Sequence, residues 1–264
     1  MADAALADAV AAIAREAGQM AFARWRTDFA RWEKAPGSPV CEVDIDVDRM
    51  LHARLSTLLP DAGWLSEETA DRPDRLARER VWVVDPIDGT RDYIRGRAGW
   101  CVSVALIEHG RPVIGVLDAP ARGEVWRARA GAGATVARED GKRFDLAAGD
   151  RHDFEGARVP VDALPKTDRT LVAVEKPNSI ALRIAMVASD RADLVATLRW
   201  GNEWDIAAAV LVAGEAGATV SDALGAPILF NKPDPRAYGV LVTAPGIHAA
   251  SVKHLAGRAR AVIG

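Results

Sequence analysis

The 264-residue chain has little cysteine, no long apolar run and no excess of basic residues. Its two cysteines, Cys41 and Cys101, are too few for a disulfide scaffold, and we expect the protein in a reducing compartment, the cytoplasm. No apolar stretch is long enough to cross a bilayer, so we expect no membrane partner. Lys and Arg number 34 against 37 Asp and Glu, a net charge of −3, which argues against a protein that coats a nucleic-acid polymer.

The rest of the composition is that of a globular protein, because 49% of the residues are hydrophobic and 27% are charged. This apolar share is large enough to fill a sizeable core. The N-terminal segment carries charges inside its apolar stretch, which predicts an amphipathic helix rather than a signal peptide.

Hydrophobic periodicity predicts an α/β fold, in the sense of layered α+β. We expect helices over 4–32, 44–59, 179–188 and 205–216, and from 246 onward. We expect strands over 63–66, 81–84, 100–108, 111–119, 123–130, 170–174, 218–221 and 238–243. Residues 131–169 are polar and Gly-rich, which predicts loops with one weak strand. We therefore expect an N-terminal lobe over 1–145 and a C-terminal lobe over 165–264.

Two carboxylates follow the strand expected at 81–84. The segment DPIDGT places Asp85 and Asp88 around a bend, where Pro86 cannot continue a paired strand and Gly89 permits a tight backbone path. Converging carboxylates repel one another, so they need a cation or a shared proton. With no His or Cys beside them, these oxygen ligands favour Mg²⁺. The alternative is that both aspartates only cap a turn.

Asp44, Asp46 and Asp48 form a second acidic cluster. Their spacing is like the start of a calcium-binding loop, but Arg49 stands where that loop needs glycine and Leu55 where it needs glutamate. We therefore reject a calcium loop and expect Asp46 and Asp48 to interact with a helix N-terminus.

Two further acidic pairs support the metal interpretation. Glu67 and Glu68 follow the strand expected at 63–66, and Asp205 opens an expected helix, where it would also serve as N-cap. We expect Glu68 to be a neighbour of the site rather than a ligand, and Glu203 to face solvent.

Three segments resemble the signatures of the inositol monophosphatase family, namely WLSEET (64–69), VVDPIDGTRDYI (83–94) and NEWDIAAAVLVAGEAGA (202–218). Their order and separation agree with the family, and the resemblance extends from the first helix to the last strand. These enzymes are Mg²⁺-dependent, lithium-sensitive phosphatases of the fructose-1,6-bisphosphatase superfamily. The resemblance implies an αβαβα sandwich with a metal site between two lobes, and commonly a homodimer.

The resemblance also implies roles for individual residues. Glu67 would bind a metal and help to activate water, and Asp85 would bridge two metals. The carbonyl of Ile87 would bind the first metal, and Asp88 and Asp205 would bind the second. Two such metals neutralise the phosphoryl oxygens, activate the water and assist the leaving oxygen.

Other positions would contact water, substrate or a third metal. Thr90 would orient the attacking water, and the N–H groups of Gly89 and Thr90 would cradle phosphate if they open a helix. Arg183 and Asp205 would contact substrate. Asp44 would lie near a weaker third metal, with Lys34 beside it.

The substrate is indicated less clearly. In inositol-selective relatives a glutamate stands seven residues before the aspartate of the WD pair, a place held here by Leu198. The segment around Arg183 resembles 3'(2'),5'-bisphosphate nucleotidases, in which a basic residue assists a second phosphate, and Arg91 and Asp92 also favour that branch. Arg183 has the alternative of a surface charge. Trp200 would stack a base or fill a lobe interface.

Three functions follow from the sequence. The first is a Mg²⁺-dependent phosphomonoesterase for inositol monophosphate or a similar small polyol phosphate. The second is a 3'(2'),5'-bisphosphate nucleotidase with the same chemistry. The third is a metal- or phosphate-binding protein without turnover, which is disfavoured because all five motif residues are present: Glu67, Asp85, Asp88, Thr90 and Asp205. The family's usual Thr or Ser upstream of Asp44 is replaced by Cys41.

Overall fold

A seven-stranded sheet is the largest layer of the protein, seen in a computed structural model that describes residues 3–263. Its strands follow in spatial order β3 (Gly63–Ser66), β4 (Arg80–Asp88), β5 (Cys101–Glu108), β6 (Arg111–Ala119), β7 (Glu124–Arg129), β8 (Ala134–Arg138) and β9 (Arg143–Asp145). β3 and β4 are parallel, and every other neighbouring pair is antiparallel. The parallel pair brings two strand ends to one edge, where the site is built.

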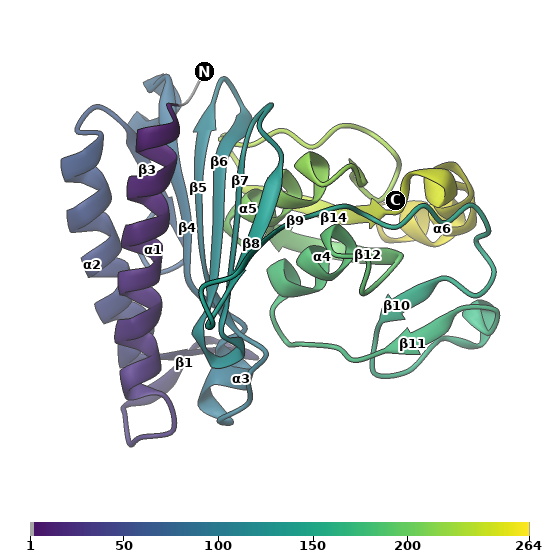
Figure 1. Cartoon of the computed structure of the whole chain (residues 1–264), viewed down its shortest axis with the longest axis horizontal. Helices are drawn as coiled ribbons and strands as arrows, with labels where there is room; N and C mark the ends of the chain where they lie inside the picture. Colours follow the sequence, from purple (N-terminus) through teal and green to yellow (C-terminus); the bar gives the residue numbers. More distant parts are fainter. Residues whose placement is uncertain (1–2, 264) are drawn as a thin grey trace.

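Helices cover both faces of this sheet (Figure 1). α1 (Ala4–Arg24) and α2 (Glu42–Leu58) lie on one face, and α4 (Ile180–Ala188) and α5 (Glu203–Glu215) lie on the other. Beyond α4 and α5 comes a three-stranded sheet in the order β12 (Leu194–Asn202), β14 (Arg236–Thr243), β13 (Thr219–Ser221), and then α6 (His248–Ile263). The layers thus run αβαβα, as predicted from the family resemblance.

Smaller elements complete the chain. β1 (Arg31–Ala35) and β2 (Ser38–Cys41) form an antiparallel hairpin, α3 (Thr90–Ile94) follows β4, and β10 (Arg158–Pro160) pairs in parallel with β11 (Val172–Val174). The two-lobe division remains a prediction, and its terminal residues 1–2 and 264 lie outside the described part of the chain.

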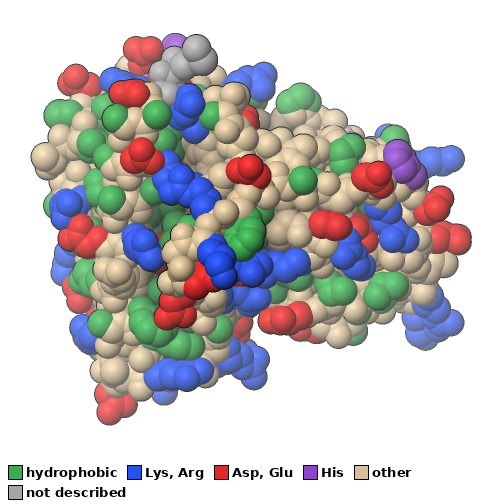
Figure 2. All heavy atoms as spheres, in the orientation of Figure 1, with side chains coloured by type: hydrophobic (Ala, Val, Ile, Leu, Met, Phe, Trp, Pro, Cys, Tyr) green, Lys and Arg blue, Asp and Glu red, His purple; other side chains and the backbone are tan. Residues whose placement is uncertain are grey.

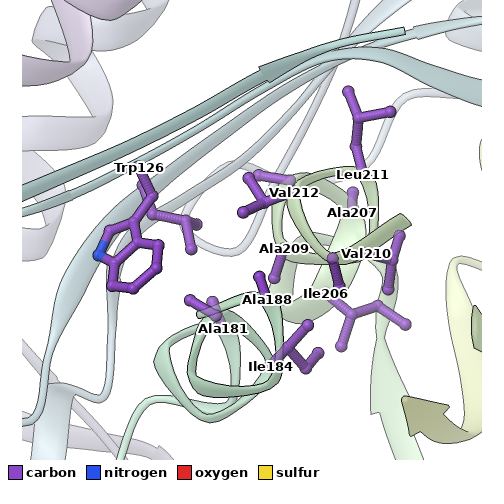
Figure 3. Close-up of a cluster of buried hydrophobic side chains, with 14 of the residues drawn as sticks. Trp126, Ala181, Ile184, Ala188, Ile206, Ala207, Ala209, Val210, Leu211 and Val212 are labelled. Carbon is purple, nitrogen blue, oxygen red and sulfur yellow. The ribbon is translucent and has the colours of Figure 1, made fainter. Parts of the chain in front are cut away.

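The core between the large sheet and α4/α5 is rich in small side chains (Figure 3). Alanines of α5 let the helix approach β6 so closely that a Cβ on Gly115 would lie 2.6 Å from the carbonyl oxygen of Ala208. Trp126 closes the side of this cluster next to α4. The close packing holds the N-terminus of α5 against the edge where β3 and β4 end.

Charges of both signs are interspersed over the face shown in Figure 2, as the near-balanced composition implies. Across the described residues, no helix combines the length and the apolar character that a bilayer span requires.

The first predicted helix is wrong beyond Arg24. Instead of continuing to residue 32, the chain leaves the helix at Trp25 and forms the β1–β2 hairpin. Trp25 and Phe29 still pack against the α1/α2 core, Trp25 beside Trp100 and Phe29 beside Tyr93. These two buried aromatic residues have the spacing of a helix although their segment is irregular, which is why the sequence pattern predicted a longer helix.

Three other predictions on the elements need correction. β4 continues past residue 84 to Asp88, because its pairing with β5 skips Pro86 through a register shift rather than ending there. β12 was not predicted, since a bulge between Thr197 and Trp200 breaks its alternation. Residues 131–169 hold three short strands, β8, β9 and β10, rather than one.

Candidate active site

The ends of β3 and β4 place two acidic residues side by side. Ser66 pairs with Val84, so Glu67 follows β3 just where Asp85 continues β4, and the Glu67 amide donates to the Val84 carbonyl at 3.3 Å. The Asp85 side chain is 1% exposed and accepts a hydrogen bond from the Ile87 amide at 3.0 Å. Local hydrogen bonding therefore fixes the direction of the Asp85 carboxylate.

The third carboxylate comes from the other side of the molecule. Asp205 is the third residue of α5 and not its N-cap as predicted, because the helix begins earlier and Asn202 is the N-cap. Its Oδ2 accepts a hydrogen bond from the Asn202 amide at 2.9 Å, as part of a capping box. Oxygen atoms of Glu67, Asp85 and Asp205 all lie within 4.8 Å of one another. Residues that are far apart in the sequence thus converge on one point.

Asp88 is held beside this cluster by α4. Its Oδ2 accepts hydrogen bonds from the Ser179 hydroxyl and, at 2.7 Å, from the Ala181 amide. Ser179 is also the N-cap of α4, accepting from the Leu182 amide at 2.9 Å. These contacts leave the Oδ1 atom of Asp88 available to a ligand, and Ser179 has a supporting role that its sequence position did not signal.

Burial and mutual repulsion raise the pKa of each cluster aspartate. Burial is the main cause at Asp85, whose pKa is well above its usual value, with Glu67 and Asp88 adding to the effect. Burial and the charge of Asp88 raise the pKa of Asp205 to about 8, and burial raises the pKa of Asp88 to about 6. Because these carboxylates are buried and repel one another when ionised, the site favours a bound cation.

Thr90 connects the predicted third-metal region to the main cluster. Its Oγ1 lies 2.9 Å from the Ile87 carbonyl oxygen and 3.1 Å from Oδ1 of Asp44. The other oxygen of Asp44 accepts from the amide and the thiol of Cys41, both at 2.9 Å. Cys41 therefore occupies the capping position of α2 in place of a hydroxyl residue, and Asp44 is buried.

Gly89 makes the sharp turn between Asp88 and α3. Its φ is +96°, and a Cβ there would lie 2.6 Å from the Gly99 carbonyl oxygen and 2.9 Å from the Ser179 amide nitrogen. Only glycine fits this position without backbone movement. α3 begins at Thr90, so the helix start on which the predicted phosphate cradle of Gly89 and Thr90 depends is present, although the helix is short.

Lys34 reaches the site from the β1–β2 hairpin. Its Nζ donates to Oε1 of Glu67 at 3.2 Å and to Oε1 of Glu68 at 2.6 Å. Lys34 was predicted beside Asp44, but its ion-pair partners are Glu67 and Glu68. Burial raises the pKa of Glu68 to about 7, although Lys34 opposes this.

Asp48 does not lie at the N-terminus of a helix as expected, because α2 begins six residues earlier, at Glu42. It is 5% exposed, and it accepts hydrogen bonds from the hydroxyls of Ser66 and Thr69. It therefore supports the loop that carries Glu67. Asp46 also lies beyond the first turn of α2, whose acidic residues are Glu42 and Asp44, and it pairs with Arg49 instead, so the prediction of an interaction with the helix N-terminus is wrong for both.

The carboxylates line a cavity of about 490 Å³ that also has a cationic wall. Its lining includes Arg91, Lys176, Arg183 and Arg199. Arg183 is partly buried and donates to the Pro177 and Asn178 carbonyls at 2.9 and 2.5 Å, so it is not a free surface charge. Burial and the charge of Arg199 lower the pKa of Arg183, while Asp88 opposes them.

Lys176 and Arg199 were missed because each is an isolated cation outside any motif. Leu198, in the place of the polyol-binding glutamate, packs instead against the core of the outer sheet. Trp200 is 50% exposed and contacts Tyr238 and Arg236, so it does not fill an interface, and its stacking on a base stays a prediction.

Glu203 is the clearest error at the site. It was expected in solvent, but it is fully buried and forms an ion pair with Lys232 at 2.6 Å. The loop 229–235 folds over the start of α5 and supplies its partners. The acid lies two residues before Asp205 and is not among the residues that line the cavity.

The donor set fits a divalent metal ion. It consists of carboxylate oxygens that lie within 4.8 Å of one another, with the Ile87 carbonyl nearby in the chain, and such oxygens are hard ligands. Burial and neighbouring acids disfavour the ionised form of Asp85, and a bound cation would offset this. A layered α/β fold with such a cluster at strand ends beside a cationic pocket defines a phosphate-ester-processing enzyme.

Comparison with known proteins gives the family. The sequence profile of the Inositol monophosphatase family matches residues 3–262, and the chain belongs to this family. An Escherichia coli K12 protein named 3'(2'),5'-bisphosphate nucleotidase CysQ is 32% identical over 206 residues, which are 74% of this chain and 80% of that protein. The fructose-1,6-bisphosphatase/inositol-1-monophosphatase of Thermotoga maritima is 30% identical over 224 residues, covering 80% and 82%.

A solved structure of an IMPase from Thermotoga maritima matches with a TM-score of 0.80 and 26% identity, covering 97% of this chain and 98% of that one. Fold and family together make the protein a phosphatase, a hydrolase of phosphoric monoesters. Which ester it hydrolyses differs among these relatives.

Proposed function

We propose that this phosphatase uses Mg²⁺ and hydrolyses a small ester that carries a second anionic group, as adenosine 3',5'-bisphosphate does. The observation that carries this choice is the cationic wall, formed by Lys176, Arg183 and Arg199 in the same cavity that the carboxylate cluster lines. An inositol or other polyol monophosphate is the second candidate, and the name of the Thermotoga maritima relative supports it.

Glu67, Asp85 and Asp205 would hold the metal, with Asp88 and the Ile87 carbonyl completing its ligands. Bound Mg²⁺ would supply charge neutralisation on the phosphoryl oxygens and a lowered pKa of water. The protein's own part is to bind, orient and move protons.

Thr90 would orient the attacking water through Oγ1, whose position is set by the Ile87 carbonyl and Asp44. Glu67 would accept the proton that this water loses, since its carboxylate is partly exposed at the cavity and within reach of Lys34. The backbone at Gly89 and Thr90, together with Arg183 and Asp205, would position the substrate. Much of the rate enhancement would then come from positioning and electrostatics.

The cationic wall supports a second phosphate on physical grounds. Arg183 and Arg199 lie close enough for their charges to oppose one another, and an anion bound between them would relieve this repulsion. A neutral sugar ring offers no such gain. Relatives named 3'(2'),5'-bisphosphate nucleotidase agree with this choice.

The test is phosphate release from adenosine 3',5'-bisphosphate and inositol 1-phosphate by the wild type and the variant Arg199→Gln. We expect the variant to raise KM for the bisphosphate about tenfold, the value of one charged hydrogen bond, and to leave KM for inositol 1-phosphate nearly unchanged. Arg236→Gln is the matched control, because Arg236 is an exposed arginine paired with Asp234 outside the cavity. Faster turnover of inositol 1-phosphate by orders of magnitude would favour the second candidate.

Three further proposals rest on the family resemblance. They are lithium inhibition, a homodimer and a cytoplasmic location. Lithium inhibition is measured in the same assay, and light scattering after gel filtration gives the oligomeric state.

A further inference from the structure

Glu203 fastens the start of α5 to the loop 229–235. Its carboxylate accepts hydrogen bonds from the amides of Asn231 and Lys232, at 2.6 and 3.1 Å, and pairs with the Lys232 ammonium. Its own amide donates to the Pro235 carbonyl at 2.9 Å. Four contacts thus hold the first residue of α5 against one loop, and Asp205 follows two positions later.

Arg75 holds the same loop from the opposite side. Its side chain is 1% exposed, donates to Oδ1 of Asn231 at 2.6 Å and to the Lys232 carbonyl at 2.9 Å. It also forms a two-point ion pair with Asp71, at 2.6 and 2.9 Å. Gly63 leaves room for it, since a Cβ there would lie 2.9 Å from the Cβ of Arg75.

Asp71 lies four residues after Glu67, in the segment that leads from β3 to the 3-10 turn η1 (Pro73–Ala77). The contacts of Asp71, Arg75, loop 229–235 and Glu203 therefore form a continuous path. It begins beside the segment carrying Glu67 and ends at the helix turn carrying Asp205. The path thus ends, on each side, in a segment that carries one member of the carboxylate cluster, Glu67 on one side and Asp205 on the other.

We propose that Arg75 and Glu203 are positioning residues, which set the separation of Glu67 from Asp205 through this path. The inference rests on the proposed metal-dependent function. Neither residue lines the cavity, so neither touches metal or substrate. A buried charged side chain whose hydrogen bonds are all made is held rigidly, and removal of one partner is strongly destabilising. Residues that position other residues need this rigidity.

The path explains why a buried acid and a buried arginine are tolerated outside the site. Arg75 offers a planar set of donors that binds a carboxylate and two loop acceptors at once. Asn231 adopts a left-handed φ of +57°, which turns its amide toward Glu203 while its side chain meets Arg75. The conformation of the loop at Asn231 therefore depends on both Arg75 and Glu203.

The test is direct Mg²⁺ binding to the full chain by isothermal titration calorimetry, with no substrate present. Glu203→Gln keeps the shape of the side chain and removes its charge, and Arg75→Met removes the donors. We expect each to raise the Mg²⁺ dissociation constant about tenfold, the low end of the effect of residues that support metal ligands. Arg75→Lys, which keeps the charge but loses the two-point contact, should fall between Arg75→Met and wild type.

Arg158→Met is the matched control. Arg158 forms a comparable two-point ion pair with the buried Asp193, but this pair does not lead to a residue of the cluster. Melting temperatures in EDTA show how far each variant is destabilised.

Unchanged Mg²⁺ affinity in folded Glu203→Gln would overturn the inference while leaving the proposed function intact. An equal loss of affinity in Arg158→Met would overturn it as well, since a general loss of stability would then explain the effect. Failure of the wild type to bind Mg²⁺ at millimolar concentration would overturn the proposed function itself.

Discussion

The ammonium of Lys34 lies 3.2 Å from the carboxylate of Glu67, a member of the carboxylate cluster. The pair joins the β1–β2 hairpin to the end of β3 and places a positive charge where a metal ion would also bind. The two cations compete for the same carboxylate, since Glu67 has to neutralise both.

Replacement of Lys34 with Met should therefore tighten Mg²⁺ binding. Loss of one positive charge makes the site more attractive to a cation, and we expect the dissociation constant to fall about threefold to tenfold, or about 1 kcal/mol for a partly exposed pair. Calorimetric titration measures this. An increase in the dissociation constant would contradict the competition between Lys34 and the metal.

Added Mg²⁺ should stabilise the fold. The cluster brings together carboxylates that repel one another when ionised, and a ligand that binds only the folded state raises its stability by mass action. At a Mg²⁺ concentration 100 times the dissociation constant the gain is about 2.7 kcal/mol, or a shift in Tm of several degrees. Differential scanning fluorimetry with and without EDTA tests it, and Asp85→Asn should show little of the shift.

Asp118 predicts a pH effect on stability that is independent of the site. This aspartate on β6 is 2% exposed, its Oδ2 has no hydrogen-bond partner among the described residues, and it fits against α1 where Gly18 has no side chain. Burial raises its pKa to about 7, and the charge of Arg15 opposes the shift.

A carboxyl with a raised pKa in the folded state binds its proton more tightly there than in the unfolded chain. Its contribution to stability is therefore complete below about pH 4 and is lost as pH rises to about 7. Asp118→Asn mimics the protonated form, so its advantage over wild type in urea unfolding should grow from pH 5 to pH 8. Asp145→Asn, an exposed aspartate on β9, is the control, and an advantage that stays constant with pH would refute the argument.

Gly89→Ala should abolish activity. The new Cβ would meet backbone atoms of Gly99 and Ser179 at under 3 Å, and the left-handed φ adds strain. The turn that carries Asp88 and Thr90 would then move, and we expect at least a hundredfold loss of kcat, since a displacement of about 1 Å at a reacting centre costs this much. Gly131→Ala, at a positive φ with open space around it, is the control for the backbone strain alone.

Local sequence patterns predicted most of the helices and strands, whereas the order of the layers came from the family resemblance. Strands β3 and β6 fall at their predicted limits, and Gly89 makes the tight turn that the DPIDGT segment predicts. Convergence of Glu67, Asp85 and Asp205 needed the family resemblance, because no local rule brings α5 to the end of β3.

What the sequence missed depends on contacts between distant segments. Glu203 looked like a solvent-facing acid because its partners, Asn231 and Lys232, lie 28 and 29 residues further on. The hairpin after α1 was hidden because Trp25 and Phe29 remain in the core after the helix has ended. No sequence motif indicated a role for Arg199, because its role depends on the cavity that it lines and not on its neighbours in the chain.

The most direct test of the central claim is the Mg²⁺ dependence of phosphate release by the wild type and Asp85→Asn. Asp85 is buried at the centre of the cluster, and the amide keeps its shape while removing one negative charge. We predict that the wild type releases phosphate from adenosine 3',5'-bisphosphate only with Mg²⁺, and that Asp85→Asn loses about three orders of magnitude in kcat, or about 4 kcal/mol. Full Mg²⁺-dependent activity in folded Asp85→Asn, or unchanged activity of the wild type in EDTA, would contradict the account.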